Sequence, residues 1–363
     1  MCLAVPIMII DFHNDTLLKL DLLGGSFFDN HKDVCCDWQK MRKADVAGAF
    51  FSIWANPAFF DGGEVEAFIK KKVDEARRLL ESSEHKTSIY RCDSKQKSFS
   101  KNQIGIFLSV EGGYVLNNSP LKAEYLRSLG IRKLTLTHFQ SLEWAACSSD
   151  DKTGHGLTSL GKEIIHALNE NGIIIDIAHA ATRTILDAAK HSKSPIVYSH
   201  GGARGIYSNS RCIADDAIRA VASTGGVVGI SFFPEHLTSV AHKEDGFRKF
   251  WEDIEILKSN KELSPCQKGE AEIRKLLFEY PRPEKIPGLE NVFRHIDYVV
   301  QLVGEDSVAI GSDFDGVPYT CRGLEDISKI RALIPIMKKA NYSNERIKKI
   351  MGGNIERLVR SFS

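Results

Sequence analysis

The chain has 363 residues, of which 43% are hydrophobic and 26% are charged, as in ordinary globular proteins. Its 48 basic and 47 acidic residues nearly cancel, which argues against a protein that binds nucleic acid or a membrane surface through net charge. Apolar runs stay well below the roughly 20 residues that a membrane-spanning helix needs.

The opening segment MCLAVPIMII has no basic stretch ahead of its apolar residues. We therefore expect it to lead into a first strand and not to act as a signal peptide. With eight cysteines and no export signal, we expect reduced thiols and a cytoplasmic protein.

Short apolar, β-branched runs alternate along the chain with longer stretches at helical spacing. The short runs predict eight strands, at residues 7–10, 47–54, 104–110, 131–137, 173–177, 195–199, 226–233 and 308–311. The longer stretches predict helices at residues 64–82, 122–129, 159–171, 182–191, 215–223, 324–340 and 343–360. This alternation predicts a (β/α)8 barrel of the TIM type that forms a single domain over residues 1–363.

The segment between the seventh and eighth strands is too long for a simple crossover. It predicts charged helices at 246–258 and 270–280, then a barrel helix at 292–303. We expect a helical insertion near residues 236–290 that lies over the barrel mouth and carries a lid.

Polar residues follow the predicted strands at their carboxyl ends, which share one face of such a barrel and build its active site. These candidate site residues are His13, Asp15, Glu111, His138, His179, His200 and Asp313. Taken alone, the first two have an alternative explanation as a helix-capping Asp beside a hydrogen-bonded His.

Imidazoles and carboxylates that converge on one rim would repel or titrate one another unless positive ions lie among them. Two divalent metals, with zinc suited to these ligand types, would resolve this. We assign His13 and Asp15 to one metal, His179 and His200 to the other, and Glu111 to the bridge between them. A hydroxide held between the metals would be the nucleophile.

Several motifs resemble, in order, those of the membrane or renal dipeptidases, the M19 peptidases of the amidohydrolase superfamily. They are DFHNDT at 11–16, VEGG at 110–113, LTLTH at 134–138, SHGGAR at 199–204, SRCIADD at 210–216, GSDFDGVP at 311–318 and MGGNIERL at 351–358. The resemblance implies a zinc-dependent dipeptidase that cleaves small dipeptides, including L-D dipeptides, with two zinc ions on the five ligands named above.

The resemblance also implies roles for three further residues. His138 would stabilise the oxyanion next to the substrate carbonyl, Arg211 would bind the substrate carboxylate, and Asp313 would carry the proton from water to the leaving amine. Without the resemblance, His138 could be a buried structural histidine, Arg211 a surface residue beside a helix, and Asp313 a helix cap.

In the family that the chain resembles, a His commonly follows the EGG motif, whereas this chain has Tyr114 at that position. It also has Phe232-Phe233 where an aromatic hydroxyl is common. We expect Trp144 to form an aromatic wall of the site, and we interpret His236 and His295 as structural or solvated. A homodimer is implied by the resemblance only.

Two other functions remain open. The chain could be an amidohydrolase that acts on a lactam, a lactone or an N-acyl amino acid, since the fold and a metal site do not fix the substrate. It could also be a noncatalytic metal-binding barrel, although such a protein would be expected to lose a ligand or Asp313.

Overall fold

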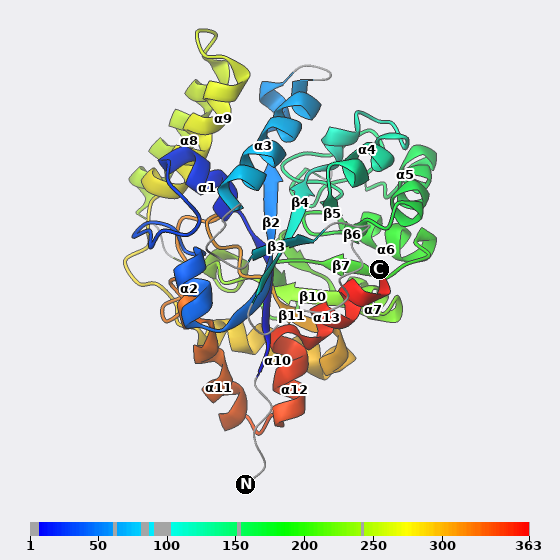
Figure 1. The fold of residues 1–363 in the computed structure, drawn as a ribbon, viewed down its shortest axis with the longest axis vertical. Helices are drawn as coiled ribbons and strands as arrows, with labels where there is room; N and C mark the ends of the chain where they lie inside the picture. Colours follow the sequence, from blue (N-terminus) through cyan, green and yellow to red (C-terminus); the bar gives the residue numbers. More distant parts are fainter. Residues whose placement is uncertain are drawn as a thin grey trace.

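The computed structural model describes residues 7–60, 64–80, 87–90, 103–150, 154–240 and 243–362. Eight parallel strands form a nearly closed barrel in these ranges (Figure 1), so the predicted fold class is confirmed. In their order around the barrel they are β1 (Ile9–Asn14), β2 (Val46–Trp54), β4 (Ile104–Glu111), β5 (Ile131–Thr135), β6 (Ile174–Asp176), β7 (Ile196–Tyr198), β10 (Val227–Ile230) and β11 (Val308–Ile310).

The last strand returns beside the first, and backbone hydrogen bonds beyond the strand ends join them. The amide of Asp313 donates to the carbonyl of His13 at 3.0 Å, and the amide of Asp15 donates to the carbonyl of Phe314 at 2.9 Å. These bonds bring together two segments of the chain that lie about 300 residues apart and that both carry candidate site residues.

The barrel interior is a packed apolar layer to which most strands contribute one residue. Phe12 of β1, Phe50 of β2 and Phe107 of β4 belong to it, with the rings of Phe50 and Phe107 stacked at 4.5 Å. Strand β5 contributes the fully buried Lys133 instead, whose ammonium lies 5.4 Å from the ring centroid of Phe12. The interior therefore holds one cation close to the candidate site.

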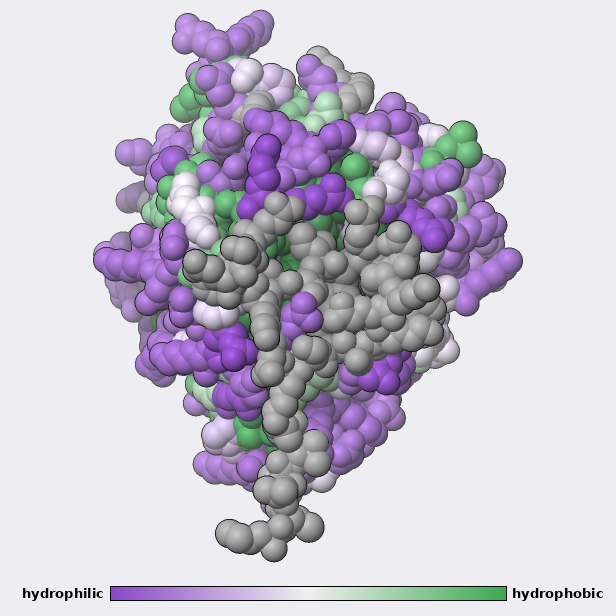
Figure 2. Space-filling view, viewed as in Figure 1, coloured by the Kyte–Doolittle hydropathy of each residue, from purple (hydrophilic) through white to green (hydrophobic). Residues whose placement is uncertain are grey.

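Helices surround the barrel and bury the outward faces of the strands (Figure 1). They are α1 (Thr16–Leu23), α2 (Trp38–Lys43), α3 (Glu64–Leu80), α4 (Lys122–Ser128), α5 (Ser159–Glu170), α6 (Thr182–His191), α7 (Asp215–Ser223), α10 (Glu290–Val303), α11 (Leu333–Lys339), α12 (Asn344–Lys348) and α13 (Asn354–Ser361). Outside the grey atoms, the face in Figure 2 is mainly hydrophilic, with apolar residues in small separate areas. Among the described residues, no helix is both long enough and apolar enough to cross a membrane.

The predicted insertion contains α8 (Glu244–Ser259) and α9 (Pro265–Arg274), which continues into a π-helical turn, η4 (Lys275–Glu279). The two helices lie side by side beyond α1 (Figure 1). The side-chain amide of Asn56, after β2, donates to both carboxylate oxygens of Glu272 at 3.0 Å. Because burial raises the pKa of the Glu272 carboxyl, this amide contact compensates part of its desolvation.

The structure differs from the predicted elements in a few places. Strand β1 extends to Asn14, so His13 lies within the strand and not after it. The two closing helices are broken: η6 (Ile327–Ala332) precedes α11, and η7 (Lys349–Gly353) separates α12 from α13. Strands β3 (Thr87–Tyr90), β8 (Gly202–Ala203) and β9 (Cys212–Ile213) were not predicted. The sequence also predicts a polar connection rich in Ser and Lys at 84–101, which lies outside the described residues apart from β3.

Candidate active site

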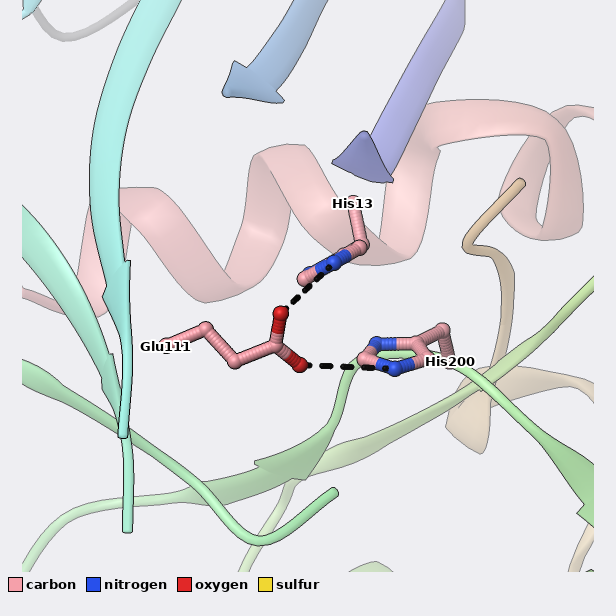
Figure 3. A group of neighbouring side chains, drawn as sticks. All are labelled: His13, Glu111 and His200. Carbon is pink, nitrogen blue, oxygen red and sulfur yellow. Dashed lines mark ion pairs between the residues drawn. The ribbon is translucent and has the colours of Figure 1, made fainter. Parts of the chain in front are cut away.

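Glu111 lies between two histidines at the carboxyl ends of the strands (Figure 3). One carboxylate oxygen is 3.5 Å from Nε2 of His13 on β1, and the other is 3.6 Å from Nε2 of His200, which follows β7. Glu111 itself ends β4. A carboxylate that turns its two oxygens toward two different imidazoles has the arrangement that a bridging ligand requires.

The other two candidate ligands complete the cluster. Asp15 Oδ2 lies 3.3 Å from Nε2 of His13. His179 Nε2 lies 2.9 Å from Glu111 Oε1 and 3.2 Å from Nε2 of His200. All five candidate ligands therefore lie together at one end of the barrel, although they come from widely separated parts of the chain.

The backbone at the site adopts conformations that are uncommon for residues with side chains. His179 and Asp313 have φ values of 64° and 65°, in the left-handed region. Such strain persists only where the surrounding structure enforces it, and it is typical of functional sites. Gly112 has a φ of 115°, and a Cβ there would lie 2.0 Å from the ring of Tyr114. The EGG motif thus leaves room for the residue that follows it.

Tyr114, which follows the EGG motif, has a structural role. Its hydroxyl donates to the carbonyl of Glu111 at 2.7 Å and accepts from the amide of Ala55 at 3.0 Å. Burial raises the pKa of this hydroxyl, which therefore stays protonated. Tyr114 joins the ends of β2 and β4 and holds the backbone of the central carboxylate.

A buried polar network in the barrel contacts the Nδ1 atoms of His13 and His200. The Ser199 hydroxyl lies 2.9 Å from Nδ1 of His200 and 2.6 Å from Oδ2 of Asp176. Lys133 Nζ lies 3.2 Å from the same Asp176 oxygen and 3.3 Å from Nδ1 of His13. Such contacts fix the orientation of the rings, as is typical of histidines that bind metals.

The electrostatics of the cluster favour a positive charge at its centre. Burial would lower the pKa of His13, but the neighbouring Glu111 and Asp15 carboxylates raise it to about 10. Burial raises the pKa of Asp15 to about 6. His179 has its pKa lowered to about 4 by burial and by Arg211, so it is a neutral imidazole with a nitrogen available to a cation.

These residues fit divalent metal ions. Within the described chain, Oδ1 of Asp15 and Nε2 of His13 are buried without a hydrogen bond. Three groups of ligand atoms each lie within 4.8 Å of one another, namely His13 with Glu111 and His200, Glu111 with His138 and His179, and His13 with Asp15 and Asp313. Imidazole nitrogens and carboxylate oxygens are ligands of zinc in proteins.

The three residues with implied catalytic roles border the cluster. Arg211 directs one guanidinium nitrogen to within 3.0 Å of Nε2 of both His179 and His200. Asp313 Oδ1 lies 3.9 Å from His13 Nε2, and burial raises the pKa of this carboxyl to about 7. His138 Nε2 lies 3.9 Å from Glu111 Oε2, and burial lowers the pKa of this imidazole.

A cavity of about 330 Å³ opens over the cluster, and its walls include residues that the sequence analysis did not assign to the site. Trp54 and Phe139 form an aromatic wall of the cavity. We expected Trp144 in this wall, but Trp144 is fully buried and does not line the cavity, so this prediction was wrong. His236 was interpreted as structural or solvated, but it lines the cavity. Its Nδ1 lies 3.9 Å from Asp313 Oδ2.

The insertion and the loops after β10 and β11 close the other side of the cavity. Lining residues from these segments are Phe233, Glu235, Trp251, Leu276, Tyr280, Val317 and Pro318. Phe232 points away from the cavity and packs against Phe314 at 5.4 Å, so only one of the two adjacent phenylalanines borders it. Val317 and Pro318 belong to the motif at 311–318, but no motif marks the other five residues, because their positions depend on how the loop after β10 and the insertion pack.

The fold and the cluster define a barrel of the metal-dependent hydrolase type. The sequence model of the family described as membrane dipeptidase (peptidase family M19) matches residues 2–363. The chain therefore belongs to this family and is a metallo-dipeptidase.

Relatives of known sequence or structure are similar over nearly the whole chain. An uncharacterized dipeptidase of Schizosaccharomyces pombe is 29% identical over 96% of this chain and 79% of its own length. The crystal structure of the probable dipeptidase PvdM from Pseudomonas aeruginosa is similar with a TM-score of 0.75 and 22% identity, covering 98% of this chain and 96% of that one. A metallo peptidase from Rhodobacter sphaeroides, crystallised with a phosphinate mimic of the dipeptide L-Ala-D-Ala, has a TM-score of 0.74 and 20% identity, with 98% and 99% covered. At these identities the solved structures support the fold alone.

Proposed function

We propose that this chain hydrolyses small dipeptides with two zinc ions, one on His13 and Asp15 and one on His179 and His200, bridged by Glu111. The observation that carries the proposal is the position of the Glu111 carboxylate, which turns one oxygen to His13 and the other to His179 and His200. The mixture of imidazole and carboxylate ligands supports zinc.

When bound, two zinc ions would act as Lewis acids and would lower the pKa of a water molecule shared between them, which makes that water a nucleophile near neutral pH. The protein supplies the orientation of the substrate and the transfer of protons. The carbonyl carbon gains a bond to the water oxygen, and its bond to the amide nitrogen breaks.

Arg211 would hold the carboxylate of the dipeptide, because its planar guanidinium matches a carboxylate with two parallel hydrogen bonds. Its nitrogen now lies against His179 and His200, so the side chain has to turn toward the cavity when those imidazoles bind an ion. Arg211 NH1 makes no hydrogen bond within the described residues and is available to a ligand.

Asp313 would take the proton from the attacking water and deliver it to the leaving amine. Its backbone amide is fixed by the carbonyl of His13, which keeps the carboxylate next to the proposed metal site. His138, whose Nε2 lies 3.9 Å from Glu111 Oε2, would donate to the oxyanion of the tetrahedral intermediate, an interaction that typically accelerates such reactions about 10²–10³-fold.

L-D dipeptides are included in the proposal because a mimic of L-Ala-D-Ala is bound by the Rhodobacter sphaeroides neighbour. The test uses purified protein stripped by a chelator and then supplied with zinc. L-Ala-L-Ala and L-Ala-D-Ala should be cleaved only after zinc is restored, and Asp313→Asn should lose most of this activity. Cleavage of lactams or N-acyl amino acids without cleavage of any dipeptide would contradict the proposed substrate class.

A matched control keeps the test specific for the site. Glu345→Gln removes a carboxylate from the exposed side of α12, where the side chain is 70% exposed. This variant should retain the activity of the wild type with zinc.

A further inference from the structure

Phe139 is an exposed aromatic residue in the wall of the cavity over the candidate metal ligands. It follows His138 in the loop after β5, and 42% of its surface is exposed. Single exposed apolar residues are common on protein surfaces and need no explanation. Phe139 differs from them because it borders the cavity in which the proposed reaction takes place.

Trp54 and Phe139 form one aromatic surface together with His138. Trp54 ends β2 and is the direct partner of Glu111 in the ladder between β2 and β4. Its ring centroid lies 5.3 Å from that of His138 and 5.3 Å from that of Phe139, both in edge-to-face arrangements. The ring centroids of His138 and Phe139 are 3.7 Å apart. The aromatic wall therefore flanks the imidazole that is proposed to act at the substrate carbonyl.

The backbone that carries this wall is held by hydrogen bonds within its own loop. The thiol of Cys147 donates to the carbonyl of His138 at 2.8 Å, and the hydroxyl of Ser149 donates to the carbonyl of Phe139 at 3.3 Å. A surface that is already ordered loses little conformational entropy when a ligand packs on it. The wall is thus prepared to bind an apolar group.

The direction in which a dipeptide binds determines which of its side chains meets the wall. In the proposed function, Arg211 holds the carboxylate of the carboxyl-terminal residue, and His138 donates to the oxygen of the carbonyl that is attacked. That carbonyl belongs to the amino-terminal residue, whose side chain is attached to the adjacent carbon atom. The amino-terminal side chain is therefore the one closest to the wall around His138.

We propose that Trp54 and Phe139 make this enzyme select dipeptides whose amino-terminal residue has a large apolar side chain, such as phenylalanine. The inference rests on the proposed dipeptidase function and adds a substrate class to it. A phenylalanine side chain would cover the exposed surface of Phe139 and could add an edge-to-face contact to the apolar area that it buries. A methyl group removes too little apolar surface from water to gain the same interaction.

The experiment compares three dipeptides with the zinc-loaded protein. Phe-Ala and Ala-Phe are each compared with Ala-Ala, so that the same side chain is placed at either end. For Phe-Ala, kcat/KM should be higher than for Ala-Ala by about tenfold or more, as expected when a large apolar side chain leaves water. Ala-Phe should show a clearly smaller gain, because its phenylalanine lies on the side of Arg211.

Variants assign this preference to the wall. Phe139→Ala should lower the ratio of kcat/KM for Phe-Ala to that for Ala-Ala by about threefold or more, and Phe139→Leu should keep most of the ratio because leucine is still large and apolar. The ratio cancels any general loss of activity, including one caused by a displaced His138. Phe278→Ala is the matched control, since Phe278 is 43% exposed on η4 and is not among the described residues that line the cavity. It should keep the wild-type ratio.

Three results would overturn the inference: equal kcat/KM for Phe-Ala and Ala-Ala in the wild type, an equal gain for Ala-Phe, or an unchanged ratio in Phe139→Ala. If no dipeptide is cleaved, the proposed function fails separately. Calorimetric binding of the same dipeptides then decides the inference. It predicts that Phe-Ala binds more tightly than Ala-Ala to the wild type, and that this difference shrinks in Phe139→Ala; equal binding of both dipeptides to the wild type would contradict it.

Discussion

Lys133 and Asp176 form an ion pair of 3.2 Å that is fully buried below the candidate metal ligands. Lys133 also contacts Nδ1 of His13, and Asp176 reaches His200 through Ser199. The pKa of the Asp176 carboxyl is lowered, because Lys133 and the hydroxyls of Ser199 and Thr135 outweigh the effect of burial. This ion pair thus links the barrel interior to His13 and, through Ser199, to His200, which are proposed to bind different metal ions.

Removing one member of this pair should destabilise the protein strongly. Lys133→Met leaves the Asp176 carboxylate buried without its partner, and we expect the free energy of unfolding to fall by about 3–5 kcal/mol. Urea denaturation measures this change. Lys133→Met combined with Asp176→Asn should recover part of the loss. Lys70→Met at the exposed pair with Asp74 should leave the denaturation midpoint unchanged. A midpoint for Lys133→Met equal to that of the wild type would show that the pair contributes no stability.

His295 predicts a pH dependence of stability. Its Nδ1 accepts from the amide of Ala203 and its Nε2 donates to the carbonyl of Leu237, both at 2.8 Å. Burial lowers the pKa of this imidazole to about 4. Between about pH 4 and 6.5, the imidazole therefore binds more protons in the unfolded chain than in the folded protein. Its contribution to the free energy of unfolding is complete above pH 6.5 and falls as the pH decreases.

His295 contributes up to about 3 kcal/mol to the change in the free energy of unfolding between pH 4 and 6.5. His295→Gln should flatten the acid limb of a plot of unfolding free energy against pH, and His166→Gln on α5 serves as the control. An acid limb of equal slope in His295→Gln and in the wild type would assign the pH dependence to other groups.

Tyr114→Phe should weaken both the fold and metal binding. The change removes the donor to the carbonyl of Glu111 and leaves the amide of Ala55 without its acceptor, which costs about 1–3 kcal/mol. Zinc affinity, measured by competition with a chelator, should fall about tenfold because the backbone of Glu111, the proposed bridging ligand, is less fixed. Tyr125→Phe, at a half-buried tyrosine on α4, provides the comparison. Unchanged zinc affinity in Tyr114→Phe would limit Tyr114 to a role in stability.

Arg211→Lys tests carboxylate recognition. Lysine keeps the charge but lacks the planar fork, so kcat/KM for a dipeptide should fall about 10–100-fold, mainly through KM. The same dipeptide with an amidated carboxyl end should be a poor substrate of the wild type and should lose little further in the variant. Arg248→Lys, whose side chain is 70% exposed on α8, is the control. Equal losses for the free and amidated dipeptides in Arg211→Lys would assign Arg211 another role.

The barrel was predictable from the sequence because each strand is short, apolar and followed by helical spacing. The same pattern located Glu111, His179 and His200, since polar residues that directly follow such strands meet at one end of the barrel. His13 was proposed as a ligand from the His-x-Asp pattern beside the first strand. The predicted strand ended too early because Asp11 and Asn14 continue it as buried polar residues.

Other features depend on tertiary packing and could not be predicted. Glu235 and His236 follow β10 without a recognisable motif, and their place in the cavity is set by loops and by the insertion. Trp144 was expected in the site, but it lies beneath Gly113, where a Cβ would be 2.5 Å from its ring. Lys133 occupies a buried strand position at which the alternation of residues alone predicts an apolar side chain.

The central claim is that Glu111 bridges two metal ions, and metal content measures it most directly. Elemental analysis of the zinc-reconstituted wild type should give close to two zinc ions per chain. Glu111→Gln should give clearly fewer, and Glu345→Gln should retain two. Two zinc ions per chain in Glu111→Gln, or none in the reconstituted wild type, would contradict the account.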